Sequence, residues 1–96
     1  MEIIWMPEAV QDLSSIQTYI ELDSVVQAHQ VIMKIVLFTE TRLQTFPLSG
    51  RKGRVLGTLE LVVPKLPYFV PYRIHNNTVE LLRVYHTSRL VPEHFG

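Results

Sequence analysis

The chain contains no cysteine, no long apolar run and no excess of either charge, and each absence excludes something. Without cysteine, neither disulfides nor thiolate chemistry can stabilise the fold or act in a site. No run of about 18 apolar residues is present, so we expect no membrane span. No basic segment precedes an apolar run at the start, so we expect no signal peptide and a cytoplasmic location.

The length favours one folded unit. With 96 residues, of which 47% are apolar, the chain can bury one modest core. We therefore expect a single domain over residues 1–96. The histidines are scattered without metal-ligand spacing, so we expect neither a metal site nor a cofactor.

The net charge of zero hides two halves of opposite sign. Residues 1–48 hold six acidic and two basic side chains, a balance of −4, whereas residues 49–96 hold three acidic and seven basic ones, a balance of +4. Such a split indicates either an anionic partner for the second half or attraction between the two halves of a small domain.

The basic half opens with a cationic, glycine-containing stretch, SGRKGRVLGT at residues 49–58. Arg51, Lys52 and Arg54 stand there without an acidic neighbour in the stretch, and the glycines argue against a helix. We expect an exposed loop whose cations bind a polyanion or an acidic protein surface, or else serve only solubility.

Hydrophobic periodicity predicts an α+β fold with the order β-α-α-β-β-β. A strand at residues 2–5 precedes a helix that begins at Pro7 and ends before Asp23. Ser24 has the spacing of a capping residue, and a second helix should run from it, with Phe46 on its inner face, until Pro47. Alternation then predicts a strand at residues 59–63. The segments YFVPYRIH and TVELLRVYH, joined by Asn76-Asn77, predict a β-hairpin.

We expect the two helices to form a hairpin that packs on one face of a mainly antiparallel sheet. The predicted register of the β-hairpin pairs Ile74 with Val79, Arg73 with Glu80, Tyr72 with Leu81, and Val70 with Arg83. The other face would carry Phe69, Pro71, Leu82 and Val84 and stay open, as a partner surface would. A bulge that puts Leu81 and Leu82 on one side is the alternative, and Pro71 favours a bulge or an edge.

Three segments carry a resemblance to a known family: GRVLGTLELVV, PYFVPYRI and VELLRVYHTSR. With Trp5, Ala9, Asp12-Leu13, Ile16 and Tyr19-Ile20, they resemble the RelE/ParE toxins of bacterial type II toxin–antitoxin systems over essentially the whole chain. The segment from Tyr68 to Arg73 and the strand with Arg-Val-x-His look closer to the ParE-type branch. The resemblance implies a toxin that inhibits growth and is neutralised by a cognate antitoxin.

The two branches of this family imply different activities. ParE-type members are described as poisons of DNA gyrase, and RelE-type members as ribosome-dependent messenger RNA endonucleases. Metal-free RNA cleavage needs a base, an acid and cations near the phosphate. The candidates here are Arg73, Arg83, Tyr85 and His86, but Tyr85 and His86 are adjacent on a strand and so point to opposite faces.

A purely structural role is the alternative to catalysis at several of these positions. Arg73 is predicted to pair with Glu80, and Arg83 either pairs with a carboxylate of a helix or marks the end of the core. His86 is either a general base or a residue that caps the sheet. Phe69 stands where nucleases of the family often have arginine. We therefore favour binding of DNA gyrase without catalysis, with cleavage of messenger RNA on the ribosome as the alternative.

The residues predicted to bind the target or the antitoxin are cationic or apolar: Arg51, Lys52, Arg54, Phe69, Leu82 and Arg89. Reversing the charges of Arg51, Lys52 and Arg54 should abolish toxicity without unfolding the protein. The sequence leaves open the class of antitoxin, the stoichiometry of the complex, whether the toxin is active, and which face of the sheet the antitoxin covers.

Overall fold

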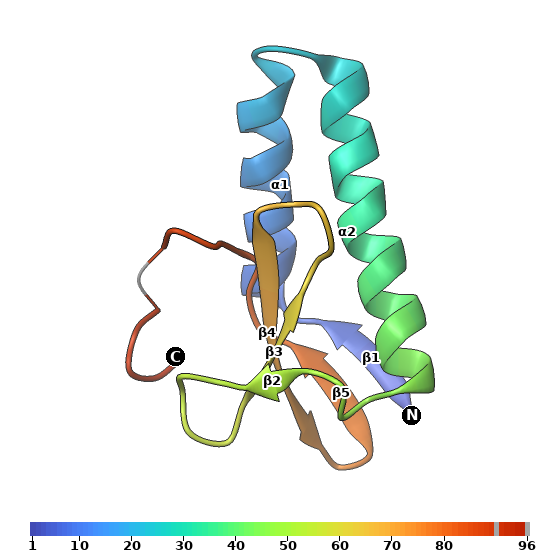
Figure 1. Ribbon diagram of the computed structural model, residues 1–96, viewed down its shortest axis with the longest axis vertical. Coiled ribbons are helices and arrows are strands. Elements are labelled where there is room, and N and C mark those ends of the chain that lie inside the picture. The colour runs from blue at the N-terminus through green and yellow to red at the C-terminus, as the bar shows by residue number, and fades with distance from the viewer. Residues whose placement is uncertain (90, 96) are drawn as a thin grey trace.

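A computed structural model describes residues 1–89 and 91–95 and shows a pair of helices standing on one side of a twisted sheet (Figure 1). The helices are α1 (Pro7–Glu21) and α2 (Val25–Thr45). The strands are β1 (Glu2–Trp5), β2 (Arg51–Lys52), β3 (Leu59–Val62), β4 (Tyr68–His75), β5 (Thr78–Leu81) and β6 (Tyr85–His86). The predicted α+β class and the opening β-α-α-β order are confirmed.

The sheet has the order β1-β5-β4-β3-β2, and β6 also pairs with β4. Only β1 and β5 run parallel among these pairings, so the sheet is mainly antiparallel as predicted. The prediction missed β2, which is two residues long and carries too little alternation to signal a strand. The single strand predicted over residues 78–86 is divided into β5 and β6. Within the described residues, neither helix combines the length and apolar character that crossing a bilayer requires.

Local signals place the ends of both helices. Pro7 is the first residue of α1, where its missing N–H costs no hydrogen bond. The Ser24 hydroxyl accepts a hydrogen bond from the backbone N–H of Gln27 at 3.1 Å, which caps α2 as predicted. The expectation that Phe46 lies on the inner face is wrong, because α2 ends at Thr45 and Phe46 leaves the helical phase with its ring exposed.

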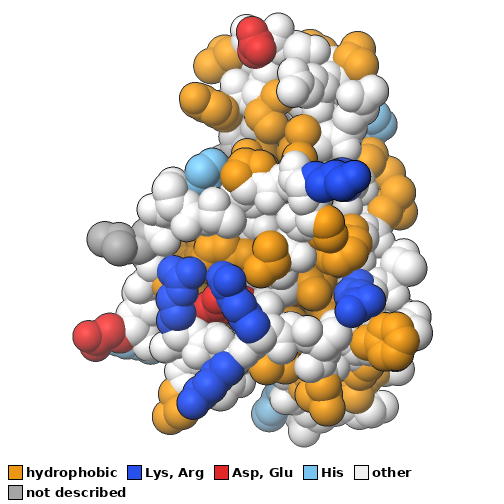
Figure 2. All heavy atoms as spheres, in the orientation of Figure 1, with side chains coloured by type: hydrophobic (Ala, Val, Ile, Leu, Met, Phe, Trp, Pro, Cys, Tyr) orange, Lys and Arg blue, Asp and Glu red, His pale blue; other side chains and the backbone are white. Residues whose placement is uncertain are grey.

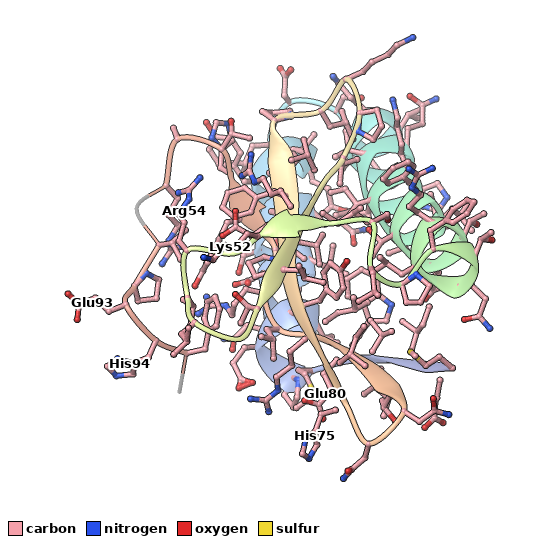
Figure 3. All side chains as sticks on the ribbon, turned by 60° about the horizontal axis from the view of Figure 1, so that its bottom comes forward. Lys52, Arg54, His75, Glu80, Glu93 and His94 are labelled. Carbon is pink, nitrogen blue, oxygen red and sulfur yellow. The ribbon has the colours of Figure 1, made fainter. Side chains whose placement is uncertain are left out.

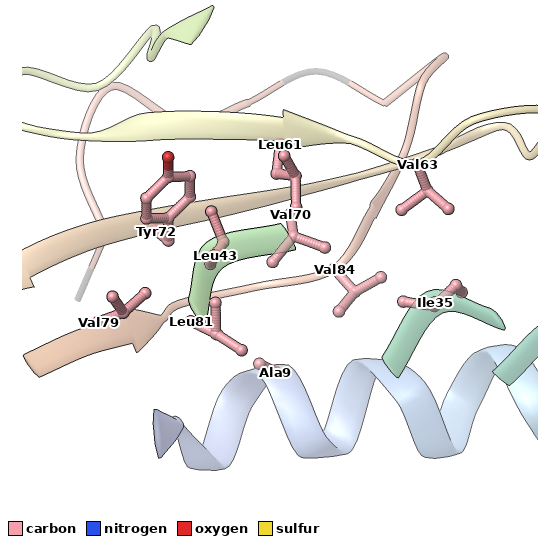
Figure 4. Packing of buried hydrophobic residues seen from close by; sticks show 10 residues of the cluster. All are labelled: Ala9, Ile35, Leu43, Leu61, Val63, Val70, Tyr72, Val79, Leu81 and Val84. Atoms are coloured by element: carbon pink, nitrogen blue, oxygen red, sulfur yellow. The ribbon is translucent and has the colours of Figure 1, made fainter. Parts of the chain in front are cut away.

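The core lies between the helical pair and the facing side of the sheet (Figure 4). Figure 4 shows side chains of both helices meeting those of three strands and the segment after β5. The buried cluster consists of Ala9, Ile35, Leu43, Leu61, Val63, Val70, Tyr72, Val79, Leu81 and Val84. Its members on β3, β4 and β5 follow the alternation of the sequence, which is why the helix-facing side was predictable.

The β4–β5 hairpin keeps the predicted register only as far as Leu81. Tyr72 pairs with Leu81, and Asn76 and Asn77 form the turn with positive φ angles of 50° and 59°. Phe69 then pairs with Tyr85. From Tyr72 to Phe69 is three residues along β4, whereas from Leu81 to Tyr85 is four residues along the opposite segment. This bulge inserts one residue, and the predicted pairing of Val70 with Arg83 is wrong.

The bulge also reverses the faces of the residues that follow it. Val84 enters the core instead of the second face, and Arg83, instead of lying beside Val70, pairs with Asp12 of α1 and lies over the Tyr85 ring. Leu81 and Leu82 do not share one side: Leu81 is in the core, whereas Leu82 lines a hollow with Phe95 on the other face. Pro71 was predicted to mark a bulge or an edge, and the bulge does lie beside it. Pro71 has no N–H to donate, but its carbonyl accepts the hydrogen bond of the Leu82 N–H.

Tyr72 fastens the connection between α2 and β2 to the core. Its buried hydroxyl donates to the Pro47 carbonyl at 2.8 Å and accepts from the Gly50 N–H at 2.9 Å. A Cβ at Gly50 would lie 2.7 Å from the Tyr72 ring and hydroxyl, so only glycine lets the chain pass this close. Burial raises the pKa of Tyr72, although the hydrogen bond from Gly50 lowers it in part.

We expect Tyr72→Phe to lower the free energy of unfolding at pH 7 by about 1–2 kcal/mol, because it leaves the partly buried Gly50 N–H and Pro47 carbonyl without their hydrogen-bond partner. Because the pKa of Tyr72 is raised in the folded state, its contribution to stability is fully present below the ordinary value of about 10. That contribution is lost as pH rises above this value and through the raised folded-state pKa. The difference between wild type and variant should therefore shrink above pH 10, as measured by urea unfolding. A constant difference up to pH 11 would contradict this role, and Tyr19→Phe, at an exposed ring, is the control at pH 7.

Candidate functional site

The second face of the sheet is covered within the chain, which corrects the expectation that it stays open. Phe69 is fully buried and Leu82 is only 9% exposed. Arginine side chains and residues 92–95 lie over this face, and the Phe95 and Tyr85 ring centres are 6.3 Å apart. Phe69 and Leu82 therefore offer no apolar patch to a partner, and the outer layer of this face is cationic.

Glu60 anchors the cationic loop. Its carboxylate is 2% exposed and lies 3.0 Å from the Nη2 and Nε atoms of Arg51, and it accepts the backbone N–H of Arg54 at 3.0 Å. The Arg54 Nε is 3.8 Å away. Figure 2 shows cationic side chains gathered around an acidic one at the lower left of this face. The acid missing from the loop sequence is thus supplied by β3.

The same two arginines cover Phe69. The Arg51 and Arg54 guanidinium carbons lie 5.4 and 5.2 Å from the centre of its ring. Both side chains remain about half exposed (48% and 50%), so each can contact a second molecule while it holds Glu60. The stretch is exposed as predicted, but Arg51 and Arg54 are not surrounded by water alone, because β2 pairs with β3 and both side chains lie against Glu60.

Lys52 differs from its two neighbours. It sits on β2 opposite Leu59, its side chain is exposed, and no ion pair involves it within residues 1–89 and 91–95. Figure 3 places Lys52 and Arg54 on the same side of the molecule as Glu93 and His94 of the final segment. Of the three cations of this stretch, Lys52 is therefore the one whose side chain can be changed with the least effect on the fold.

Tyr85 forms a second aromatic–arginine stack beside the first. Arg83 and Arg89 lie 4.9 and 5.0 Å from the centre of its ring, and Phe69 meets it edge to face at 5.9 Å. We name these residues the arginine–aromatic cluster: Arg51, Arg54, Phe69, Arg83, Tyr85 and Arg89. The cluster contains four of the predicted binding residues: Arg51, Arg54 and Arg89, which are exposed, and Phe69, which is buried beneath them.

Arg83 is held by α1, as one of the two predicted alternatives proposed. Its Nε and Nη2 atoms donate to the two carboxylate oxygens of Asp12 at 2.8 and 3.0 Å. Asp12 also accepts the backbone N–H of Val84 at 2.9 Å. The hydrogen bond from Asp12 raises the pKa of Arg83, so this guanidinium stays charged at every accessible pH.

We expect Asp12→Ala to lower the free energy of unfolding by about 2–3 kcal/mol, because it removes a bidentate pair and leaves the Val84 N–H without its acceptor. Glu80→Ala is the matched control. It breaks the 2.6 Å pair of Arg73 and Glu80, whose arginine is half exposed, and should cost less than about 1 kcal/mol. Urea unfolding of both variants is the measurement, and equal losses would contradict the structural role of Asp12.

The four nuclease candidates do not converge on one point. Arg73 pairs with Glu80 as predicted, Arg83 pairs with Asp12, and the Tyr85 ring is buried on the second face. His86 lies on the other side of the strand against Tyr68, with ring centres 5.6 Å apart. The arrangement places no base beside a free cation in the way that phosphate cleavage requires.

His86 has a different partner from the one predicted. Its Nδ1 accepts from the Ser88 backbone N–H at 3.1 Å and lies 2.8 Å from the Ser88 hydroxyl. In the neutral ring the proton then lies on Nε2, for which no hydrogen-bond partner is found among residues 1–89 and 91–95. One predicted role of His86 is to bind a backbone carbonyl and so cap the sheet. Among the described residues its ring instead binds Ser88 in a local turn.

Sequence reasoning missed three residues that shape the site: Glu60, Asp12 and Phe95. Glu60 was visible as the outward position of an alternating strand, and Asp12 as part of the family resemblance, but neither pattern names a partner. Phe95 carried no signal. Among the described residues no group of three or more His, Cys, Asp or Glu side chains could hold a metal ion.

Comparison with known families and proteins agrees with the fold and the resemblance. A family model described as "ParE toxin of type II toxin-antitoxin system, parDE" matches residues 3–91. The provisionally named toxin Y4kP of Sinorhizobium fredii is 38% identical over 91 residues, which cover 95% of this chain and 93% of that protein.

Two further similarities extend the comparison. Toxin RelE2 of Caulobacter vibrioides is 27% identical over 89 residues, covering 93% of this chain and 98% of that one. A solved structure of a chromosomal ParDE toxin–antitoxin system from P. aeruginosa superposes with a TM-score of 0.82 at 26% identity. The match covers 90% of this chain and 95% of that one, so the two chains share their overall fold.

Proposed function

The chain belongs to the ParE toxin family of type II toxin–antitoxin systems, and from this premise we propose that it inhibits growth by binding a macromolecular target rather than by catalysis. One observation carries the proposal. The candidate catalytic side chains are either committed to ion pairs or separated by the sheet, whereas half-exposed arginines form a continuous outer surface. A surface of this kind suits recognition of an acidic partner.

DNA gyrase is the proposed target, and a cognate antitoxin is the proposed regulator. Both follow from the family, since ParE-type members are described as gyrase poisons silenced by an antitoxin. Arg51, Lys52, Arg54 and Arg89 are the contact residues we propose for the target. Phe69 and Leu82, which lie beneath them, support this surface from below instead of touching the partner.

The alternative is ribosome-dependent cleavage of messenger RNA. Similarity to Toxin RelE2 favours it, as does the position of His86, which lines one hollow with Arg89 and Tyr68. In that case the exposed cations would bind RNA phosphates, and binding would weaken steeply with salt.

Two reactions in parallel separate these functions. Purified protein is added to a DNA gyrase supercoiling reaction and, separately, to translating ribosomes with an end-labelled message. We expect loss of supercoiling with accumulation of cleaved DNA, and an intact message. A cleaved message with unaffected supercoiling would overturn the proposal in favour of the endonuclease.

Within this proposal, Lys52→Glu should raise the concentration needed for half inhibition of the target by about 10-fold, because it reverses an exposed charge on the contact surface. The fold should be unaffected, since Lys52 makes no ion pair in the described part of the chain. Lys34→Glu, an exposed reversal on α2, is the matched control and should leave inhibition within about 2-fold. Equal effects of the two substitutions would argue for net charge alone.

A further inference from the structure

The β2–β3 hairpin, residues 51–62, has a tight loop at residues 53–58 that projects at the outer edge of the sheet (Figure 1). Within this loop the Gly53 N–H donates to the Thr58 carbonyl at 2.9 Å. The Thr58 N–H and hydroxyl both donate to the Val55 carbonyl, at 3.2 and 2.7 Å. Gly57 has a positive φ of 81°, which glycine adopts without strain. The loop is therefore held in one conformation by its own hydrogen bonds.

Leu56 stands at the tip of this loop with its side chain 95% exposed. Its neighbour Val55 is only 7% exposed, so the loop turns one apolar side chain inward and presents the next to solvent. Within residues 49–60 no other apolar side chain is comparably exposed. A single exposed leucine is ordinary on a protein surface, and the setting of Leu56 among cations is what distinguishes it.

Cationic side chains surround the base of the loop on both faces of the hairpin. Arg51 and Lys52 are adjacent on β2, so their side chains leave opposite faces of the sheet. Arg54 lies with Arg51 against Glu60, and both are about half exposed. An exposed arginine of the final segment adds to the same surface through the arginine–aromatic cluster. We name these residues the four contact cations: Arg51, Lys52, Arg54 and Arg89.

Duplex DNA fits this arrangement better than an acidic protein surface does. Protein interfaces depend on clustered apolar or aromatic anchors, but Phe69 and Leu82 are buried here and Leu56 stands alone at the loop. Binding to a nucleic-acid backbone needs cations rather than an apolar patch, because release of counterions from the phosphates drives it.

The shape of the hairpin suits the major groove. This groove is about 12 Å wide and admits a two-stranded β-ribbon between two rows of phosphates. Cations on both faces of the hairpin can reach both rows, and phosphate contacts of this kind fix the position of a bound protein. The floor of the groove presents the methyl groups of thymine, which an apolar side chain at the tip of the loop can contact.

We infer that the loop of the β2–β3 hairpin enters the major groove of duplex DNA, with the four contact cations on phosphates and Leu56 against the base edges. The inference rests on the proposed function, because a DNA-supercoiling target supplies the duplex. It deepens that function by making the DNA itself the acidic partner of the cationic surface.

The phosphate contacts are tested by the Kd for a fluorescently labelled duplex of about 20 base pairs, measured by anisotropy between about 50 and 200 mM salt. We expect a Kd of about 1–100 μM at the lowest salt and a slope of log K against log salt of about −3 to −4, since four phosphate contacts release counterions. Lys52→Ala should make the slope shallower by about 1. Lys34→Ala, at an exposed lysine of α2, should leave it unchanged. No binding by wild type, or equal slopes for the two variants, overturns the inference.

The contact with the bases is tested by Leu56→Ser. This change should raise the Kd at least about 5-fold without altering the salt slope, because it removes apolar contact and no charge. Leu22→Ser, at an 83% exposed leucine where α1 ends, is the matched control and should change the Kd by less than about 2-fold. Equal effects of the two leucine substitutions overturn the inference.

A change in the DNA provides the complementary test. Replacing thymine by deoxyuridine removes the methyl group from the floor of the major groove and leaves every phosphate in place. It should weaken binding of wild type by about 2–4-fold and leave binding of Leu56→Ser unchanged. Equal weakening of both proteins overturns the contact that we assign to Leu56.

The outcomes separate the inference from the function beneath it. Inhibition of supercoiling without DNA binding overturns the inference and leaves the function standing. DNA binding with the expected slope and unaffected supercoiling supports the inference and overturns the function. Single-stranded RNA of the same length and polyglutamate of matched charge are the competing polyanions. Affinity for either that equals the affinity for duplex DNA overturns the inference, since neither has a major groove that admits the hairpin.

Discussion

Tyr85→Ala is expected to lower the free energy of unfolding by about 3–5 kcal/mol, the range for removing a fully buried aromatic ring. The ring is 1% exposed and lies between Phe69, Phe95 and the guanidinium groups of Arg83 and Arg89. Its loss would open a cavity on the second face and release the final segment. Urea unfolding gives the magnitude, and the midpoint should fall while the two-state slope stays similar.

Two variants make this result specific. His86→Ala alters the next residue of the same strand, where the side chain is exposed, and should cost less than about 1 kcal/mol. Tyr85→Phe keeps the ring and its stacking and should cost little. A loss below about 1 kcal/mol for Tyr85→Ala would mean that the second face contributes little to stability and that its covering segment opens readily.

Glu60→Ala is expected to cost about 2–4 kcal/mol, because it leaves two arginines without a counter-charge and the Arg54 N–H without an acceptor. The half-exposed guanidinium groups can turn to water, which keeps the loss below that of a fully buried pair. Glu60→Gln retains an acceptor for the Arg54 N–H and should lose about half as much.

A local readout accompanies the global one. With Glu60 removed, β2 loses its side-chain anchor on β3, and trypsin should cut after Arg51, Lys52 or Arg54 at least about 10-fold faster than in wild type. Cleavage after Lys34, inside α2, should not change ahead of global unfolding. Unaltered loop cleavage would show that the backbone pairing alone holds β2 in place.

The Glu60 contacts also revise an experiment that the sequence suggests. Reversing Arg51, Lys52 and Arg54 together would surround a buried carboxylate with further carboxylates, so loss of toxicity would accompany loss of structure. The contacts of Glu60 therefore predict that the triple variant is destabilised, so it is a poor test of the contact surface. Lys52 alone provides a charge reversal that leaves the Glu60 contacts in place.

Much of the fold was predictable because its signals are local. Pro7 and Ser24 mark helix starts, the Asn76-Asn77 pair fixes a tight turn, and the alternation from Leu59 onward marks a strand. The register of the β4–β5 hairpin followed from its two-residue turn as far as Leu81. The candidate site was less predictable, because the partners of Arg51, Arg54 and Arg83 lie on other elements.

The amino-acid sequence by itself determined the α+β class, the order of the helices and the family, since each depends on patterns carried by neighbouring residues. Only the tertiary structure decided the face on which Arg83 and Val84 lie, because a single inserted residue reverses the faces of the side chains that follow it. Only the tertiary structure decided, too, that the cationic loop is anchored and the second face covered. Glu60 contacts Arg51 across the sheet, and Phe95 contacts Tyr85 from the final segment. No hydrophobic period in the sequence encodes such contacts.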